Sequence, residues 1–344
     1  MKNEFSPVFR LGRLSLLWAP RSVIVCLGLL MSMLVVSVIL MGTGSLNVMP
    51  VQVFAALFGL SENPMADRII LSIRLPRVLT AVLVGASLGM AGSVFQSISR
   101  NALGSPDILG FTTGAATGAI LQIIVFNAGP METAAAAVGS GLFAAALVYG
   151  LAMKRHSSGG YRLVLVGIGV GAVLSGLNTV LLVMGDIDHA MSAQLWLSGS
   201  LNTRTWSHVG PAAIGFAIVL PLALMNARRL DMIEMGDETA AQLGVHVERT
   251  RLLMVMTGVG LTAISTAAAG PIAFVALIAP QLARRLTRSP RVPLVSGALT
   301  GAVLLLCADL LALRLPLNLN VPIGLMTGII GGMYLLWLLT RRAR

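Results

Sequence analysis

The chain has 344 residues, of which 56% are hydrophobic and only 11% are charged, and its mean hydropathy is +0.88. Soluble globular proteins carry about a quarter charged residues, and disordered chains lack this much apolar surface, so both classes are excluded. The net charge of +11 does not indicate a nucleic-acid partner, because basic residues of a membrane protein collect in its cytoplasmic loops. The composition therefore indicates a polytopic membrane protein.

Ten mostly uncharged stretches are predicted to cross the bilayer, each near the ~20 residues that a spanning helix needs. The first 21 residues are polar and basic, and the first stretch follows at 22–41. The other nine cover 77–97, 106–127, 132–153, 162–184, 206–226, 250–269, 271–287, 293–313 and 321–340. The Gly270-Pro271 joint is interpreted as a break between two helices, although a kink in one long helix is the alternative.

The distribution of basic residues predicts the orientation. Nineteen of the 24 lysines and arginines fall in segments on the same side of the membrane as the N-terminus. The opposite side holds five, which are Arg68, Arg74, Arg77, Arg204 and Arg314. Because basic residues mark the cytoplasmic side, both termini are expected in the cytoplasm. The same count favours the break at Gly270, since one long helix there would carry the four arginines from 284 to 291 outside.

Small residues recur at four-residue spacing within the predicted spans. The glycines that share a helix face in this way are Gly85 with Gly89, Gly110 with Gly114 and Gly118, Gly297 with Gly301, and Gly324 with Gly328. Helices associate in lipid through close van der Waals contact, which such faces permit. The spacing predicts tight helix packing and identifies no function.

Several kinds of chemistry are missing from the sequence. Neither lysine, Lys2 or Lys154, follows a glycine-rich turn, so the chain lacks a phosphate-binding loop for ATP. The four histidines are isolated, and Cys26 and Cys307 lie in apolar runs, so we expect no metal site, no cofactor and no catalytic centre. Asp309 is essentially the only ionisable residue inside a span, which argues against a proton-coupled transporter. The energy for transport is expected from another subunit.

The predicted inner loop at about 227–249 is unusual because its 231–244 part carries four acids among otherwise basic inner segments. Residues 239–243 are predicted to form a short helix, with Asp237 and Glu238 at the end where the helix dipole favours acids. Gly244 is predicted to end it. This helix is either a solvated surface element or a contact for a soluble motor subunit.

Two outer arginines, Arg74 and Arg77, flank Pro76 just before the second span, and Arg204 and Arg314 lie in other outer loops. One interpretation is that these side chains extend to the interface from helix ends. The other is a docking patch for carboxylates of a soluble partner, since arginine forms bidentate pairs with them.

Three blocks of sequence resemble the FecCD-type permeases, the membrane subunits of bacterial ATP-binding-cassette (ABC) importers for iron-siderophores, haem and vitamin B12. They are Arg74-Leu-Pro-Arg77 through to the segment ending at Gly110, Met235 to Gly244, and Gly270 to Pro280 continuing to Asp309 and Gly324. The resemblance extends from about residue 20 to the C-terminus. Within the family, Trp196–Asn202 and Leu230–Ala240 look most like the ferric enterobactin permeases of the catecholate branch.

The chain departs from the family pattern at three positions. Gln281 stands where histidine is common, and Asn320 stands where glutamate is common. Leu313 occupies the place of an arginine, with Arg314 next to it.

The resemblance implies an all-α integral membrane protein, a ten-transmembrane-helix bundle forming one permease domain over 1–344. It implies a non-enzymatic subunit that pairs with a second permease, either identical or a paralogue, in the bacterial inner membrane among its lipids. A cytoplasmic ATPase dimer would hydrolyse ATP, and a periplasmic siderophore-binding protein would deliver the substrate. The segment 1–21 would be cytoplasmic, and 227–249 would be the coupling loop.

The resemblance also implies site residues and a substrate. ATPase coupling would fall to Gly236, Asp237, Glu238, Ala240, Leu243 and Gly244. Docking of the binding protein would fall to Arg74, Arg77 and Arg314. The expected substrate is a ferric siderophore of the enterobactin type. Haem or vitamin B12 import by the same family is the alternative, and an ion-coupled secondary transporter is a more distant one.

Overall fold

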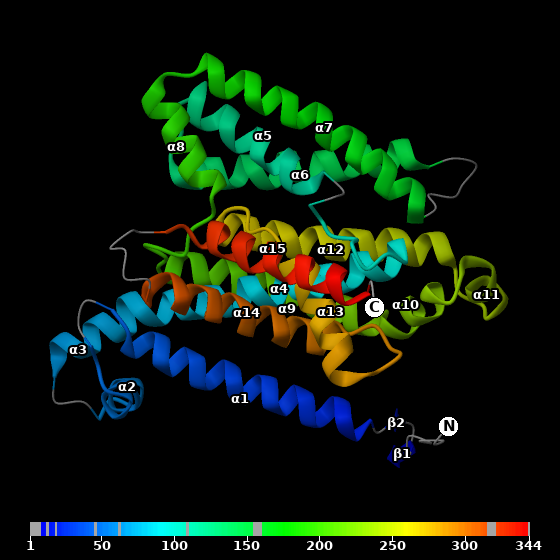
Figure 1. Cartoon of the computed structure of the whole chain (residues 1–344), viewed down its shortest axis with the longest axis horizontal. Helices are drawn as coiled ribbons and strands as arrows, with labels where there is room; N and C mark the ends of the chain where they lie inside the picture. Colours follow the sequence, from blue (N-terminus) through cyan, green and yellow to red (C-terminus); the bar gives the residue numbers. More distant parts are fainter. Residues whose placement is uncertain are drawn as a thin grey trace.

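The computed structural model describes residues 8–11, 14–17, 19–44, 47–60, 63–107, 110–153, 160–314 and 321–342. Helices dominate this part of the chain (Figure 1). The long helices are α1 (Pro20–Gly42), α4 (Leu75–Ser99), α5 (Phe111–Ile124), α6 (Pro130–Ala152), α7 (Gly160–Met184), α9 (Trp206–Met225), α12 (Val247–Ala269), α13 (Val275–Thr287), α14 (Leu294–Arg314) and α15 (Ile323–Arg342). The shorter elements are β1 (Val8–Leu11), β2 (Leu14–Leu17), α2 (Pro50–Leu57), α3 (Pro64–Ile69), the π-helix η1 (Ile70–Arg74), α8 (Ile187–Leu197), α10 (Ala227–Glu234) and α11 (Asp237–Gln242).

Each of the ten predicted spans coincides with one of the long helices. Seven of these helices are long and apolar enough to cross a membrane. Helix α5 and the 323–338 part of α15 are apolar but shorter, and α13 has 13 residues with arginines in its last turn. The predicted helical bundle is confirmed, and the count of ten spans is approximate because three of the ten helices are short.

The N-terminal segment differs from the expectation of a plain polar tail. Strands β1 and β2 pair antiparallel, with Val8 opposite Leu17 and Leu11 opposite Leu14. Val8 and Phe9 in β1 are residues that favour strands, and β2 consists of three leucines and a serine. The hairpin and the short helices α2, α3, α8 and α10 were not predicted, because elements of four to eleven residues are too short to form an apolar run of bilayer length.

The second span begins earlier than predicted. Helices α3, η1 and α4 are continuous from Pro64 to Ser99, so Arg74 and Arg77 lie within a helix and not in a loop before it. Pro76 has no backbone N–H to donate to the preceding turn, and the wider π-helical turn η1 lies directly before it. Helical geometry therefore fixes the direction in which both arginines point.

The predicted break at Gly270 is confirmed. Helix α12 ends at Ala269, and Gly270 has a φ of +75°, a conformation that favours glycine. Helix α13 then starts at Val275 and runs back toward the end of the bundle from which α12 came (Figure 1).

Helix α4 forms the centre of the bundle. In its apolar window 78% of the residues are buried within the chain, against 6% for α1 at the periphery. It packs against α14, α12, α13 and α9, while α5, α6 and α7 pack together as a second group that meets α12 through α6. Figure 1 shows this second group stacked on the first.

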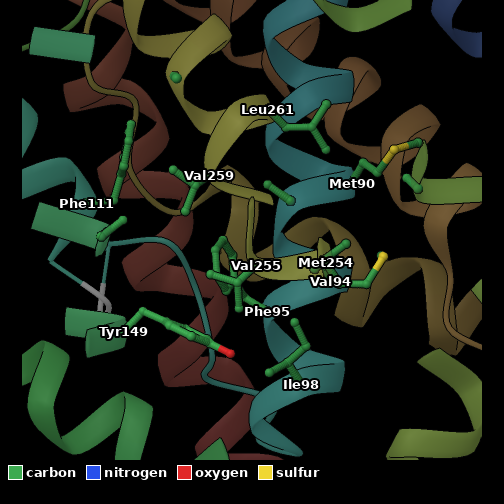
Figure 2. Packing of buried hydrophobic residues seen from close by; sticks show 14 of the residues in the cluster. Met90, Val94, Phe95, Ile98, Phe111, Tyr149, Met254, Val255, Val259 and Leu261 are labelled. Atoms are coloured by element: carbon green, nitrogen blue, oxygen red, sulfur yellow. The ribbon is translucent and has the colours of Figure 1, made fainter. Parts of the chain in front are cut away.

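Glycine faces bring the central helices into backbone contact. A methyl group at Gly89 would overlap the carbonyl oxygen of Gly297, and one at Gly301 would overlap the carbonyl oxygen of Gly85. These four residues hold α4 against α14, as small residues do in membrane bundles. Figure 2 shows the buried apolar cluster next to this contact. Met90, Val94 and Ile98 belong to the cyan helix α4, and Phe95 lies beside Val255.

Candidate functional site

The predicted coupling loop forms two short helices, α10 and α11, beyond one end of the bundle. Figure 1 shows α11 past the start of α12, and it shows α1 starting and α15 ending at this same end. The helices α2, α3 and α8 lie at the opposite end. The structure therefore separates two groups of predicted site residues, one at each end of the molecule.

Helix α11 confirms the predicted short helix and begins two residues earlier than expected. Gly236 before it has a φ of +128° and Gly244 after it a φ of +83°, so both turns favour glycine. Ala240 is fully buried against the rest of the chain, whereas Leu243 is 57% exposed. An exposed leucine at the end of a short polar helix is available for contact with another protein.

Acids in α10 and α11 hold the loop to the bundle. Both oxygens of Asp237 lie 2.8 Å from Nη2 of Arg251, which also pairs through Nη1 with Glu248. Nη2 of Arg100 lies 3.3 Å from Oδ1 of the same Asp237. Glu238, by contrast, is exposed and makes no ion pair among the described residues.

Two further acids anchor α10. Glu234 forms an ion pair with Arg284 of α13. Oδ1 of Asp231 accepts a hydrogen bond of 2.8 Å from the backbone N–H of Val292. Burial raises the pKa of the Asp231 carboxyl above its usual value, and this hydrogen bond opposes the rise.

At the opposite end, Arg74 is buried and not exposed on an outer rim as its position in the sequence indicated. Its Nη1 donates a hydrogen bond of 2.6 Å to the carbonyl oxygen of Met41 at the end of α1. The guanidinium also lies against Gly44, where a side chain would overlap it. Arg74 therefore ties α1 to the start of α4.

Arg77 forms a bidentate ion pair with Asp309 of α14. The Nε–Oδ2 distance is 2.9 Å and the Nη2–Oδ1 distance is 2.6 Å. Asp309 is 1% exposed and Arg77 is 21% exposed. The ion pair compensates the charge of Asp309, the acid inside the ninth predicted span. Part of the Arg77 side chain remains accessible to solvent.

The third predicted docking residue, Arg314, is exposed at the end of α14 and has no ion pair within the described part of the chain. Leu313 beside it is also exposed. Asn320 lies outside the described residues. Gln281 donates a hydrogen bond of 2.8 Å to the carbonyl oxygen of Ala102, so it joins α13 to the segment after α4.

Sequence reasoning missed Arg251 and Arg100 as partners of Asp237. Arg251 is one of the 19 basic residues of the predicted inner side, and its place at the start of a span gives no local sign that it is buried. A fully buried arginine must be paired, and acids 3 and 14 residues before it supply the pairs.

A cavity of about 460 Å³ lies among α5, α8 and the segments that precede α13 and begin α15. Its walls carry hydroxyl, amide and small apolar groups but no charged side chain, and they are formed by Thr112, Thr113, Ala116, Gln194, Leu197, Ser198, Pro271, Ala273, Gly324 and Leu325. Among the described residues, no three His, Cys, Asp or Glu side chains cluster as a metal site would require. The cavity can enclose a neutral group but offers no ionic anchor.

The helical bundle, with α11 beyond one end and Arg77 and Arg314 at the other, fits the arrangement that the resemblance implied for the membrane subunit of an ABC transporter. Residues 29–341 match the FecCD transport family, and the chain belongs to this family. The predicted family is therefore confirmed. As a permease the chain is not an enzyme, and ATP hydrolysis belongs to a separate subunit.

Characterised relatives match over nearly their whole length. The ferric enterobactin transport system permease protein FepG of Escherichia coli is 43% identical, covering 94% of this chain and 98% of that protein. The Fe(3+)-citrate import system permease protein YfmE of Bacillus subtilis is 34% identical, with 94% and 97% covered. The hemin transport system permease protein HmuU of Yersinia pestis is also 34% identical, with 91% and 96% covered.

A solved structure of a metal-chelate type ABC transporter in an inward-facing conformation is similar to this chain. The TM-score is 0.82 at 29% identity, and the match covers 92% of this chain and 99% of the other. The chain is thus a permease subunit of an ABC importer, in a family whose matched members carry iron-chelate complexes. This membership removes the ion-coupled secondary transporter from consideration.

Proposed function

We propose that the chain is the permease through which a ferric catecholate siderophore of the enterobactin type crosses the bacterial inner membrane. The observation that carries this proposal is the 43% identity to a ferric enterobactin permease over almost the full length of both chains. Relatives named for citrate and hemin reach 34% over similar lengths. Haem or vitamin B12 remains the alternative cargo.

The permease works with other subunits in this proposal. It pairs with a second permease, identical or a paralogue, and two cytoplasmic ATPases and a periplasmic siderophore-binding protein complete the transporter. Both termini and the α10–α11 segment face the cytoplasm. The predicted cytoplasmic side holds 19 basic residues and the opposite side holds five, which supports this orientation.

Helix α11 contacts the ATPase. The exposed side chains of Met235 and Leu243 support this role, because they are apolar groups on a short polar segment beyond the bundle. Gly236 and Gly244 bound the helix with turns that a bulkier residue would strain. Asp237 and Glu238 occupy its first turn.

The opposite end receives the binding protein through arginines. Arg314 is exposed, and Arg77 has an accessible edge, so both can meet carboxylates of a partner. Arg74 acts in the same region by holding α1 against α4, because its own guanidinium is buried. Charged pairs at such a rim guide encounter and orientation more than they add affinity.

Substrate specificity is tested in a strain that lacks its own siderophore and haem permeases. The permease is expressed with its ATPase, second permease and binding protein, and uptake of radiolabelled ferric enterobactin, ferric citrate and haem is compared. Uptake of ferric enterobactin alone, abolished by vanadate, is the expected result. Uptake of haem or citrate without ferric enterobactin would contradict the catecholate assignment and leave the importer class intact.

A further inference from the structure

Three acids spaced three residues apart attach the α10–α11 segment to three different parts of the bundle. Asp231 accepts the hydrogen bond from Val292, between α13 and α14. Glu234 pairs with Arg284 in α13, and Asp237 pairs with Arg251 in α12. The acids that distinguish this loop from the other inner segments are therefore anchors, and they do not simply face solvent.

The attachment at Asp237 differs from the other two because its partner is completely buried. The side chain of Arg251 is 0% exposed, whereas Arg284 is 32% exposed. Among the described residues, Nε of Arg251 has no hydrogen-bond partner, and Asp237 and Glu248 compensate the charge of the side chain through Nη2 and Nη1. A buried guanidinium is costly without carboxylate partners, so Arg251 cannot separate easily from Asp237.

Asp237 also reaches the central helix. Arg100, whose Nη2 is 3.3 Å from Oδ1 of Asp237, caps the end of α4 in a left-handed conformation with φ of 49°. Helices α4 and α12 pack directly against each other. One carboxylate at the first position of α11 thus holds the adjacent ends of two core helices.

We propose that Asp237 is the positioning residue that transmits displacement of α11 to α12 and α4, with Arg251 as the main receiver and Arg100 as the second. The inference rests on the proposed contact between α11 and the ATPase. Nη2 of Arg251 contacts both oxygens of Asp237 while Nη1 pairs with Glu248, so Arg251 has little freedom to slide relative to α11 and the end of α12 follows when α11 moves. A loop joined only by its peptide connections would flex and lose part of this motion.

The test uses the complete transporter reconstituted in liposomes, with ATP hydrolysis and uptake of radiolabelled ferric enterobactin measured in the same preparation. Asp237→Asn keeps the size and removes the charge. We expect uptake per ATP to fall about ten-fold while hydrolysis continues, within the usual range for coupling between sites. Asp188→Asn in α8 is the control, because it removes the same charge from an exposed position at the opposite end of the molecule and should retain wild-type uptake per ATP.

A cross-link separates failure of this inference from failure of the proposed ATPase contact. Leu243→Cys in a background of Cys26→Ser and Cys307→Ser is cross-linked to cysteines placed on the ATPase, with and without Asp237→Asn. Absence of a cross-link in both backgrounds would contradict the contact itself. A cross-link together with wild-type uptake per ATP in Asp237→Asn would overturn the role of Asp237.

A double variant keeps the test decisive if Asp237→Asn reduces the amount of folded permease. Asp237→Asn with Arg251→Gln removes both charges of this pair, so no buried cation is left with Glu248 alone to compensate it. We expect its amount in the membrane to recover and its uptake per ATP to stay low. Recovery of uptake per ATP as well would show that the ion pair serves folding alone and would overturn the proposal.

Discussion

Arg77 and Asp309 are separated by 232 residues in the sequence and joined by two hydrogen bonds of 2.9 and 2.6 Å. The pair links the first turn of α4 to the later part of α14, on the same two helices whose glycine faces meet further along. An ion pair at one end and glycine contacts along the length fix both the distance and the register between these helices. The arginine predicted to dock a partner is therefore also part of the bundle.

Removing one member of this pair should cost more than removing both. Arg77→Ala leaves Asp309 as a buried charge without its partner, and Asp309→Ala leaves the arginine. We expect each single variant to lower stability toward the lower end of ~3–5 kcal/mol, because Arg77 is partly exposed. The double variant should lose clearly less than the sum of the singles. Unfolding of the purified permease in detergent measures all three, and additive losses would contradict the pairing.

The glycine contact between α4 and α14 gives a second prediction. Gly89→Ala introduces a methyl group where the carbonyl of Gly297 lies, so the helices must move apart. We expect a loss of about 1–3 kcal/mol, as for overpacking elsewhere. Gly139→Ala in α6 is the control, since an added methyl there meets no atom within 4 Å. Its stability should equal or exceed that of the wild type, because alanine favours helices.

These contacts show which parts of the molecule the sequence could predict. Runs of apolar residues located ten helices, since each run must satisfy the bilayer independently of the others. The partner of Asp309 could not be found in this way, because nothing local distinguishes Arg77 from the neighbouring Arg74, which binds a backbone carbonyl of α1. Pairing is decided by the packing of α4 on α14, which hydropathy does not encode.

The inner loop shows a similar limit. Its acids, the short helix and the stop at Gly244 could all be recognised from local signals. The burial of Arg251 could not, because an arginine at the start of a span normally faces the interface. Only the fold brings Arg251 and Arg100 to Asp237.

The carboxyl of Asp231 gives a prediction that depends on pH. Burial raises its native pKa above the ordinary value of about 3.9. The native state therefore binds this proton more tightly than the unfolded state does. Protonation of Asp231 stabilises the fold fully below about pH 3.9, and this stabilisation is lost as the pH rises through the native pKa. The Asp231→Asn variant has no carboxyl to ionise, so it avoids this loss of stability, and its amide oxygen can still accept the hydrogen bond from Val292. We expect the variant to gain stability relative to the wild type at pH 7.5 and the difference to shrink toward pH 4.5.

Asp231→Ala is the contrasting variant, because it leaves the buried N–H of Val292 without its acceptor. It should lose about 1–3 kcal/mol, the usual cost of an unsatisfied buried donor. Melting temperatures of the three proteins at both pH values provide the measurement. A stabilised alanine variant would show that the hydrogen bond contributes nothing.

Orientation is tested with fusions after Arg344. The basic residues predict a cytoplasmic C-terminus, so a fused β-galactosidase should be active and a fused alkaline phosphatase inactive. Fusions after Arg204, in a predicted outer loop, should give the opposite result. The opposite reporter activities at both sites would show that the chain is inserted in the other orientation, with α11 on the outer side of the membrane.

The last prediction concerns docking of the binding protein. Arg314→Glu should lower uptake of radiolabelled ferric siderophore without changing the amount of permease, because the side chain is exposed and has no ion pair in the described part of the chain. Each exposed charged pair contributes only ~0–1 kcal/mol, but a like charge opposite a partner glutamate repels it. Arg77→Glu should lower uptake more than Arg77→Ala, measured at matched permease levels because both changes also leave Asp309 unpaired.

A glutamate-to-lysine change on the binding protein that restores uptake by Arg314→Glu would identify the pair directly. Arg74→Ala serves as the comparison, since loss of its bond to Met41 should reduce the amount of permease and not its uptake per molecule. Wild-type uptake by both Arg314→Glu and Arg77→Glu at matched levels would leave no docking role for these arginines. Arg77 would then act only in the ion pair that holds α4 to α14.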